Sequence, residues 1–269
     1  MISILLGFLG AAIGFILGYN VIGNSILAAT LPVVGFVIVS LPLNLIIKKK
    51  LQNLLQQVQS KIQQNQAAMQ KRMNQLQNQA GGSAKGMQKQ MEKKQTESIK
   101  QALKELDAAG HFGKWNFLAG KQINTLKGQL NFQIGDFEEA DKCFEDSMNS
   151  DHLTVAMKMV RAYKKDDWKR LRKLYKKGKK RFKDENAVII YALFSWILTK
   201  EEMIDEAISV LNEGQEKTES EVLANNWQHL VNGKTRKFSN AGLGDTWYAL
   251  KLEKPKTGKV RQRKSGKRR

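Results

Sequence analysis

The first 47 residues contain no charged side chain. Between Met1 and Ile47 there is no Lys, Arg, Asp, Glu or His, so all 45 basic and 25 acidic residues of the 269-residue chain lie beyond them. The net charge of +20 therefore belongs to the polar remainder. Such an excess favours anionic partners, meaning phospholipid headgroups, nucleic acid or acidic protein surfaces, and it leaves the fold undetermined.

Cysteine, histidine and proline are also scarce. The single cysteine, Cys143, excludes an intramolecular disulfide and a cysteine-based zinc site, and it fits a reducing compartment. His111, His152 and His229 follow no metal-ligand spacing. Three prolines and few strand-like aromatic runs predict an all-α protein.

Two apolar runs, 2–19 and 25–47, fill the uncharged segment. Crossing the hydrocarbon core of a bilayer takes about 20 helical residues. We therefore predict a transmembrane helical hairpin as domain 1–50 of an integral inner- or plasma-membrane protein. The lysines at 48–50 predict that the following domain is cytoplasmic, and a hairpin places Met1 there too. A cleaved signal peptide is the alternative, which the lack of a basic residue before the first run disfavours.

Glycines recur along one face of the first apolar run. Their lack of side-chain bulk lets another helix approach closely, either within the hairpin or between copies. We predict such packing in the membrane at Gly7, Gly10, Gly14 and Gly18. Pro32 and Pro42 interrupt the second run, which favours a helix packed against a neighbour that satisfies the freed backbone groups.

Residues 51–80 are rich in Gln and Asn and free of Gly and Pro. Apolar residues recur there at heptad spacing, at Leu51, Leu55, Val58, Ile62, Met69 and Leu76, with Asn65 and Arg72 interrupting the seam. The pattern predicts a helical stalk, either a coiled coil between copies or a solitary helix, and a polar spacer is the simpler alternative. The glycine-containing segment 81–88 predicts a flexible linker.

A helical repeat follows the linker. One stretch combines small residues at a helix crossing, a glycine turn and a phenylalanine core, at Gly128, Phe132, Gly135, Phe137, Ala140 and Phe144. A second stretch has Tyr191, Ala207 and Leu211 at matching places, and a degenerate unit around Leu171 lies between them. Over residues 116–218 these positions resemble the tetratricopeptide repeat, whose length is about 34 residues.

The resemblance implies a domain at 89–250 built as an α-solenoid of stacked helix pairs. Such repeats present a concave surface that binds peptides or other proteins. The proline that usually ends each repeat is absent here, with His152 and Glu219 in its place, and Leu171 replaces a small residue. The number of repeats and the curvature of the solenoid are therefore left open.

Two segments concentrate positive charge. Residues 158–183 hold 14 Lys or Arg with apolar residues interleaved at helical spacing, which predicts a helix with a basic outer face. The tail 251–269 holds ten, and its composition predicts disorder. We expect contact with polyanions or lipid at Lys169, Arg170, Arg172, Lys173, Lys176, Lys177, Arg261, Arg263, Lys264, Lys267, Arg268 and Arg269.

An anchor, a spacer and a helical repeat in series predict a membrane-anchored adaptor that binds a protein partner. No nucleophile with its base, paired-carboxylate motif or phosphate-binding glycine loop occurs, so we expect neither an enzyme nor a cofactor or metal site. A membrane tether for RNA or ribosomes through the basic segments is the alternative. A structural homo-oligomer, built through the glycine face and the stalk, is a third.

Overall fold

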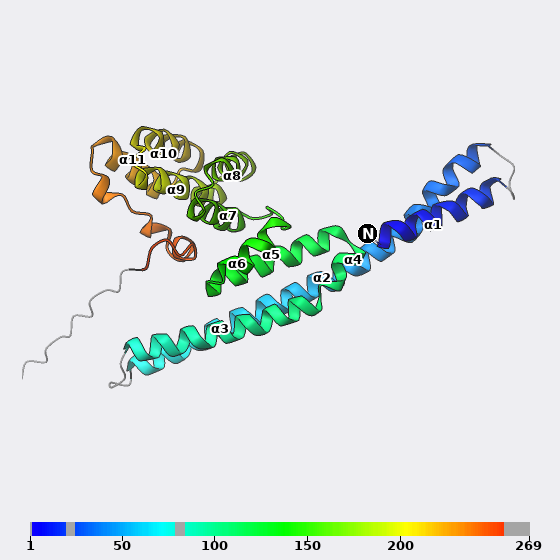
Figure 1. Cartoon of the computed structure of the whole chain (residues 1–269), viewed down its shortest axis with the longest axis horizontal. Helices are drawn as coiled ribbons and strands as arrows, with labels where there is room; N and C mark the ends of the chain where they lie inside the picture. Colours follow the sequence, from blue (N-terminus) through cyan, green and yellow to red (C-terminus); the bar gives the residue numbers. More distant parts are fainter. Residues whose placement is uncertain (1, 20–24, 79–83, 256–269) are drawn as a thin grey trace, which may run out of the picture. The chain divides into compact units, whose positions relative to one another are not determined.

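The computed structural model describes residues 2–19, 25–78 and 84–255. Over these residues the chain forms twelve α-helices and two short 3₁₀-helices and has no strand, which confirms the predicted all-α class (Figure 1). The chain divides into two compact units, an N-terminal unit, Met1–Met148, and a C-terminal unit, Asn149–Arg269. This division falls inside the predicted 89–250 domain.

The N-terminal unit begins with a closely packed helix pair. Its helices are α1 (Ile2–Leu17), α2 (Ser25–Asn78), α3 (Ala84–Ala108), α4 (His111–Trp115), α5 (Phe117–Ile134) and α6 (Phe137–Glu145). Helix α1 packs along the first part of α2 (Figure 1). The 54-residue α2 continues as one helix through Pro32 and Pro42.

Glycines set the distance between α1 and α2. A methyl group on Gly10 would lie 2.6 Å from the carbonyl oxygen of Gly35, and one on Gly14 would lie 2.5 Å from that of Leu31. On Gly7 it would lie 2.7 Å from the Phe36 ring. Three of the four predicted glycines thus meet α2 of the same chain, and Gly18 is buried as well.

The outer surface of this helix pair is apolar. Large hydrophobic side chains are between 40% and 69% exposed along it, at Ile4, Leu5, Phe8, Leu9, Ile13, Phe15, Ile16, Leu17, Tyr19, Val33, Val34, Val37, Ile38, Leu41, Leu45 and Ile46. One helical stretch, Thr30–Asn65, is long and apolar enough to cross a membrane by length and composition, a test that a signal sequence also passes. Helix α1 is apolar but shorter, with 16 residues.

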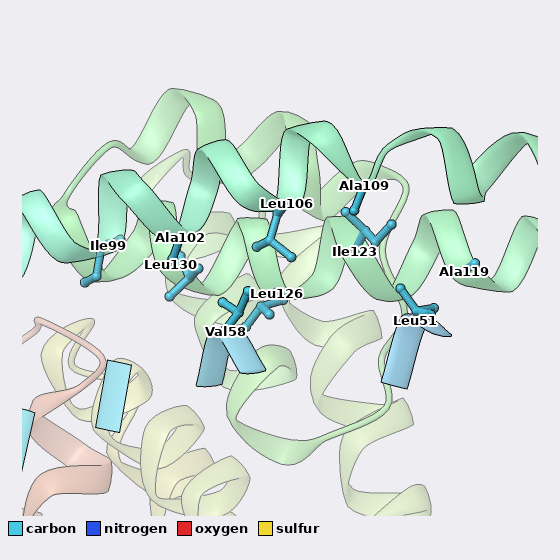
Figure 2. Packing of buried hydrophobic residues seen from close by; sticks show 10 residues of the cluster. All are labelled: Leu51, Val58, Ile99, Ala102, Leu106, Ala109, Ala119, Ile123, Leu126 and Leu130. Atoms are coloured by element: carbon cyan, nitrogen blue, oxygen red, sulfur yellow. The ribbon is translucent and has the colours of Figure 1, made fainter. Parts of the chain in front are cut away.

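The predicted stalk is not a solitary helix. It is the second part of α2, and α3 packs against it within the same unit. Figure 2 shows the cluster that joins α2, α3 and α5, made of Leu51, Val58, Ile99, Ala102, Leu106, Ala109, Ala119, Ile123, Leu126 and Leu130. Leu55 and Ile62 pack against the same cluster. The heptad seam therefore has an intramolecular partner.

Polar residues of α2 also pair with α3. The amide of Asn65, which interrupts the seam, donates to the Ser98 hydroxyl at 2.7 Å, and the Lys61 ammonium lies 2.8 Å from a Glu105 carboxylate oxygen. Helix α3 begins at Ala84, so residues 84–88 of the predicted linker are helical. The side chains of Met69, Arg72 and Leu76 and residues 79–83 lie outside the described structure.

Helices α5 and α6 form a hairpin that contains the first predicted repeat signature. Gly135 ends α5 with φ at +85°, a conformation that glycine adopts without strain, and the Asp136 carboxylate caps α6 by accepting from the Glu139 amide at 3.3 Å. A methyl group on Gly128 would lie 2.6 Å from the Phe144 ring. Phe132, Ala140 and Phe144 are buried, and the Phe132 and Phe137 ring centroids are 5.3 Å apart.

The C-terminal unit is built around one fully enclosed helix. Its helices are α7 (His152–Lys164), α8 (Trp168–Arg181), α9 (Glu185–Lys200), α10 (Ile204–Thr218), α11 (Glu221–Val231), η2 (Thr235–Lys237), η3 (Ala241–Leu243) and α12 (Asp245–Tyr248). Every residue of α9 from Ala187 to Leu198 is buried, as expected of a helix that is apolar on all sides. Helices α7, α8, α10 and α11 contact it.

The second repeat signature lies in this core. Tyr191, Ala207 and Leu211 are fully buried where α9 and α10 cross, and Leu171 is fully buried on α8. Helices α7 and α8 form one pair and α9 and α10 another. The boundary at 148/149 separates both pairs from the α5–α6 hairpin, so the predicted run of three units is divided between the two compact units.

The chain beyond α11 closes over the end of α9. Trp247 is fully buried beside Trp196, with ring centroids 5.8 Å apart, and the two oxygens of the Glu253 carboxylate accept from their indole nitrogens at 2.8 and 2.9 Å. Glu253 belongs to the predicted disordered tail 251–269. The structured unit therefore extends further than its charge-rich composition indicated.

Candidate functional site

Helix α8 carries the basic segment, and its sequence fixes which side faces the core. Leu171, Leu174, Tyr175 and Gly178 recur at helical spacing and are buried, so the intervening lysines and arginines point outward. The Asp167 side chain caps the helix by accepting from the Arg170 amide at 2.9 Å. Three basic residues lie in the last turn, where they interact favourably with the helix dipole.

Aromatic packing holds α8 against α9. The Tyr175 and Phe194 rings stack with their centroids 4.0 Å apart, and Tyr191 meets Tyr175 edge to face at 5.9 Å. The Tyr175 hydroxyl is buried, and among the described residues it has no hydrogen-bond partner. Burial raises the pKa of this phenol far above its usual value, with a smaller contribution from Glu213. The phenol therefore stays neutral. The ring packing holds α8 against α9, and the basic side of α8 faces outward.

Arg172 is engaged in a structural ion pair. Its guanidinium makes a bidentate contact with the Glu206 carboxylate of α10, in which the second bond, Nη2 to Oε2, measures 2.8 Å. This hydrogen bond is the main cause of the raised pKa of Arg172 and of the lowered pKa of Glu206. Arg172 also lies over the rings of Trp168 and Phe194. The guanidinium of Arg172, one of the predicted polyanion contacts, is thus paired with α10.

Lys179, about two turns further along α8, is engaged in the same way. Its ammonium lies 2.6 Å from one Glu213 oxygen, and Lys217 lies 2.7 Å from the other. Burial alone would raise the pKa of Glu213, but the hydrogen bonds from the two lysines outweigh it and lower the pKa. Glu213 also accepts from the Tyr191 hydroxyl at 3.2 Å.

Four other basic side chains of α8 border a hollow on the C-terminal unit. It has a volume of about 400 Å³ and is lined by Asn149, Asp167, Lys169, Arg170, Lys173, Leu174 and Lys177. Four of the predicted contact residues, Lys169, Arg170, Lys173 and Lys177, meet here and are exposed. Over the part of the chain that the structure describes, none of the four forms an ion pair with a carboxylate.

The hollow also contains groups that the charge pattern did not indicate. Asn149 comes from the loop before α7, where its side-chain oxygen accepts from the Lys158 ammonium at 2.6 Å. Asp167 adds a carboxylate and Leu174 an apolar wall. No spacing within α8 could have placed Asn149 beside it. Lys176 is exposed but does not line the hollow, and the tail residues from Arg261 to Arg269 lie outside the described residues.

The arrangement suits binding. In the described residues, no group of three or more His, Cys, Asp or Glu side chains could hold a metal ion. The hollow offers four exposed cations, one carboxylate, one amide and an apolar wall, which can hold an anionic ligand that also has donor groups. No protein-family model, curated protein or solved structure matches this chain.

Proposed function

We propose that this chain is a membrane-anchored adaptor whose C-terminal unit binds an acidic segment of a protein partner in the hollow beside α8. The observation that carries the proposal is that some cations of α8 are paired with carboxylates and others are not. Arg172 and Lys179 are held by carboxylates of α10, whereas Lys169, Arg170, Lys173 and Lys177 gather around one hollow without such a partner. Unpaired cations on a rigid helix favour an external anion.

The anchor half of the proposal is supported by the surface of the α1–α2 pair. Its outward side chains are apolar over sixteen positions, while its inward face is closed by glycines. A soluble protein rarely leaves so large an apolar surface in water, and a bilayer would cover it. Helix–helix contact through small residues is the usual way in which membrane helices pack.

The other groups of the hollow favour a peptide over a nucleic-acid backbone. The Asp167 carboxylate and the Asn149 side-chain oxygen accept hydrogen bonds, and a peptide backbone offers N–H donors to them. In RNA the only backbone donor is the ribose 2′-hydroxyl, and every repeat carries a charged phosphodiester, whereas a peptide offers an uncharged N–H at each non-proline residue. Leu174 adds an apolar contact that suits a side chain. A tetratricopeptide-like arrangement of α7–α10 would be consistent with peptide binding.

Direct binding of two matched probes tests this function. The full chain in lipid nanodiscs is titrated with a fluorescent peptide of alternating Glu and Leu and with a single-stranded RNA of equal charge. We expect tighter binding of the peptide. Reversing Lys169, Lys173 and Lys177 to Glu should weaken it by at least about tenfold, a loss of about 1.4 kcal/mol in binding free energy.

The matched control reverses Lys234, Arg236 and Lys237, three exposed cations on and beside η2, and should leave peptide affinity unchanged. Tryptophan fluorescence verifies the fold of each variant, because four of the five tryptophans lie in the C-terminal unit. Tighter binding of RNA that is lost with the α8 reversals would support the tether for RNA or ribosomes instead. If the two sets of reversals weaken peptide binding equally, the hollow is not the site.

A further inference from the structure

One apolar patch of the N-terminal unit belongs neither to its core nor to the helix pair. Among the described residues of that unit outside α1 and α2, the large hydrophobic side chains that stand exposed are Phe117, 50% exposed, and Leu118, 54% exposed. Both lie in the first turn of α5. The opposite face of α5 is buried through Ala119, Ile123 and Leu126. The core of the N-terminal unit therefore does not cover these two side chains.

Hydrogen bonds tie this turn to one end of the α1–α2 pair. The Ser3 hydroxyl, at the start of α1, donates to the Trp115 carbonyl at 2.8 Å. The Asn116 side-chain nitrogen donates to the Asn44 side-chain oxygen of α2 at 3.0 Å. The Asn116 side-chain oxygen in turn caps α5 by accepting from the Leu118 amide at 2.8 Å. The corner between α4 and α5 is thereby fixed to both membrane-type helices.

The position of Asn44 defines the depth of that corner. Asn44 precedes the lysines at 48–50 by four residues, which is about 6 Å along a helix. The apolar outer surface of α2 continues to Leu45 and Ile46, 62% and 53% exposed. The corner thus lies where the apolar surface gives way to charge. In a membrane this is the interfacial zone, in which tryptophan and other aromatic side chains concentrate.

We propose that the α4–α5 corner is a second membrane contact that inserts Phe117 and Leu118 into the bilayer interface among anionic headgroups. It rests on the proposed membrane anchor and adds a monotopic contact to it. Charge supports the choice of lipid, since Lys114 is exposed next to the corner and the Lys121 ammonium lies 4.3 Å from the Phe117 ring centroid. Lysines beside inserted apolar groups attract anionic lipid and reach the headgroups with their ends.

Nitroxide accessibility of the full chain in phosphatidylcholine and phosphatidylglycerol vesicles tests the proposal. In a Cys143→Ala background, single labels replace Leu118, Leu41 on the outer face of α2, and Glu138 on the exposed face of α6. Oxygen partitions into the hydrocarbon, whereas a nickel chelate stays in water. We expect the label at 118 to favour oxygen over nickel several-fold more than the label at 138, and to be shallower than the label at 41.

Each other result has one meaning. If label 118 behaves like label 138 while label 41 stays in lipid, the corner is not inserted and the anchor stands. If label 41 is also open to nickel, the proposed anchor itself fails. If label 118 is shielded from both reagents, a protein surface covers the corner and lipid insertion is overturned. Labels at 41 and 138 on the same background show whether the Cys143 replacement preserves the fold.

Discussion

Single glycines decide whether α1 and α2 can meet. Gly10 faces the backbone of Gly35, which cannot move aside for an added side chain as a flexible side chain could. We expect Gly10→Leu to destabilise the helix pair by about 1–3 kcal/mol, the usual cost of overpacking. Spin labels on the exposed positions Ile13 and Val34, in a Cys143→Ala background, should then show a longer and broader distance distribution.

Ala12→Leu is the matched control, because Ala12 is exposed on the outer face of α1. It adds the same apolar bulk and should leave the distance between the labels unchanged. An unchanged distance in both variants would mean that α1 and α2 tolerate bulk at their contact. The close contact at the glycines would then contribute nothing to the stability of the helix pair.

Single carboxylates make the C-terminal unit sensitive to acid. The pKa values of Glu206 and Glu213 are lowered from 4.5 in the folded chain, so the unfolded chain binds protons more readily as the pH falls. Their stabilisation is present above the unfolded value and is lost as the pH drops through the folded values. Because these pairs are about one-third exposed, each contributes less than about 1 kcal/mol.

Urea unfolding followed by tryptophan fluorescence measures this effect. We expect the urea midpoint to fall mainly below about pH 5, as the pH drops through 4.5 and the lower folded values. The double variant Glu206→Gln, Glu213→Gln should have a lower urea midpoint at neutral pH, and that midpoint should fall less on acidification. Glu219→Gln with Glu221→Gln removes two exposed carboxylates and should keep the slope of the unchanged chain. A double variant with the original slope would assign the acid sensitivity to other groups.

Helix pairs show where the sequence is informative and where it is not. The seam residues Leu51 and Val58 were identified correctly from heptad spacing, but their partner was not. Helix α3 supplies that partner through Ile99, Ala102 and Leu106, and its many Gln and Lys residues obscure this short apolar row. A period of seven identifies a buried face, and it cannot tell which helix covers that face.

The candidate site has the same limit. The spacing of Leu171, Leu174 and Tyr175 gives the basic outer face of α8, because alternation on one helix is a local property. Which cations stay unpaired depends on Glu206 and Glu213, each 34 residues beyond its partner on α8. Only tertiary packing brings those carboxylates to Arg172 and Lys179, so the sequence could not show which cations of α8 are held in ion pairs.

The α2–α3 pair is tested by placing a charge in its seam. Val58 is fully buried between α2 and its neighbours, so Val58→Asp would bury an unpaired carboxylate at a cost of several kcal/mol. We expect amide hydrogen exchange in α3 to accelerate strongly. Gln59→Asp introduces the same charge at an exposed site and should leave α3 protected. Equal protection in the two variants would mean that α3 is held without this seam.

For the chain as a whole, the proposed anchor predicts a transmembrane hairpin of α1 and α2. Helix α1 has 16 residues and is about 24 Å long, somewhat less than the hydrocarbon core of about 30 Å. Its packing against α2 and the absence of charged residues between the two helices still favour a hairpin. Under the proposed hairpin, the lysines at 48–50 would put both ends of the chain on the cytoplasmic side.

Tags at the two ends distinguish the arrangements. In intact cells we expect an N-terminal and a C-terminal tag both to resist external protease, while a cysteine introduced among residues 20–24 reacts with an external thiol reagent. A cleavable N-terminal tag with a protected C-terminal tag would mean that α2 crosses alone. Loss of the N-terminal tag from the mature chain would identify the first run as a cleaved signal. The hairpin requires both tags to be protected because α1 and α2 run in opposite directions, so that the start of α1 at Ser3 and Asn44 of α2 lie beside the same corner at Trp115 and Asn116.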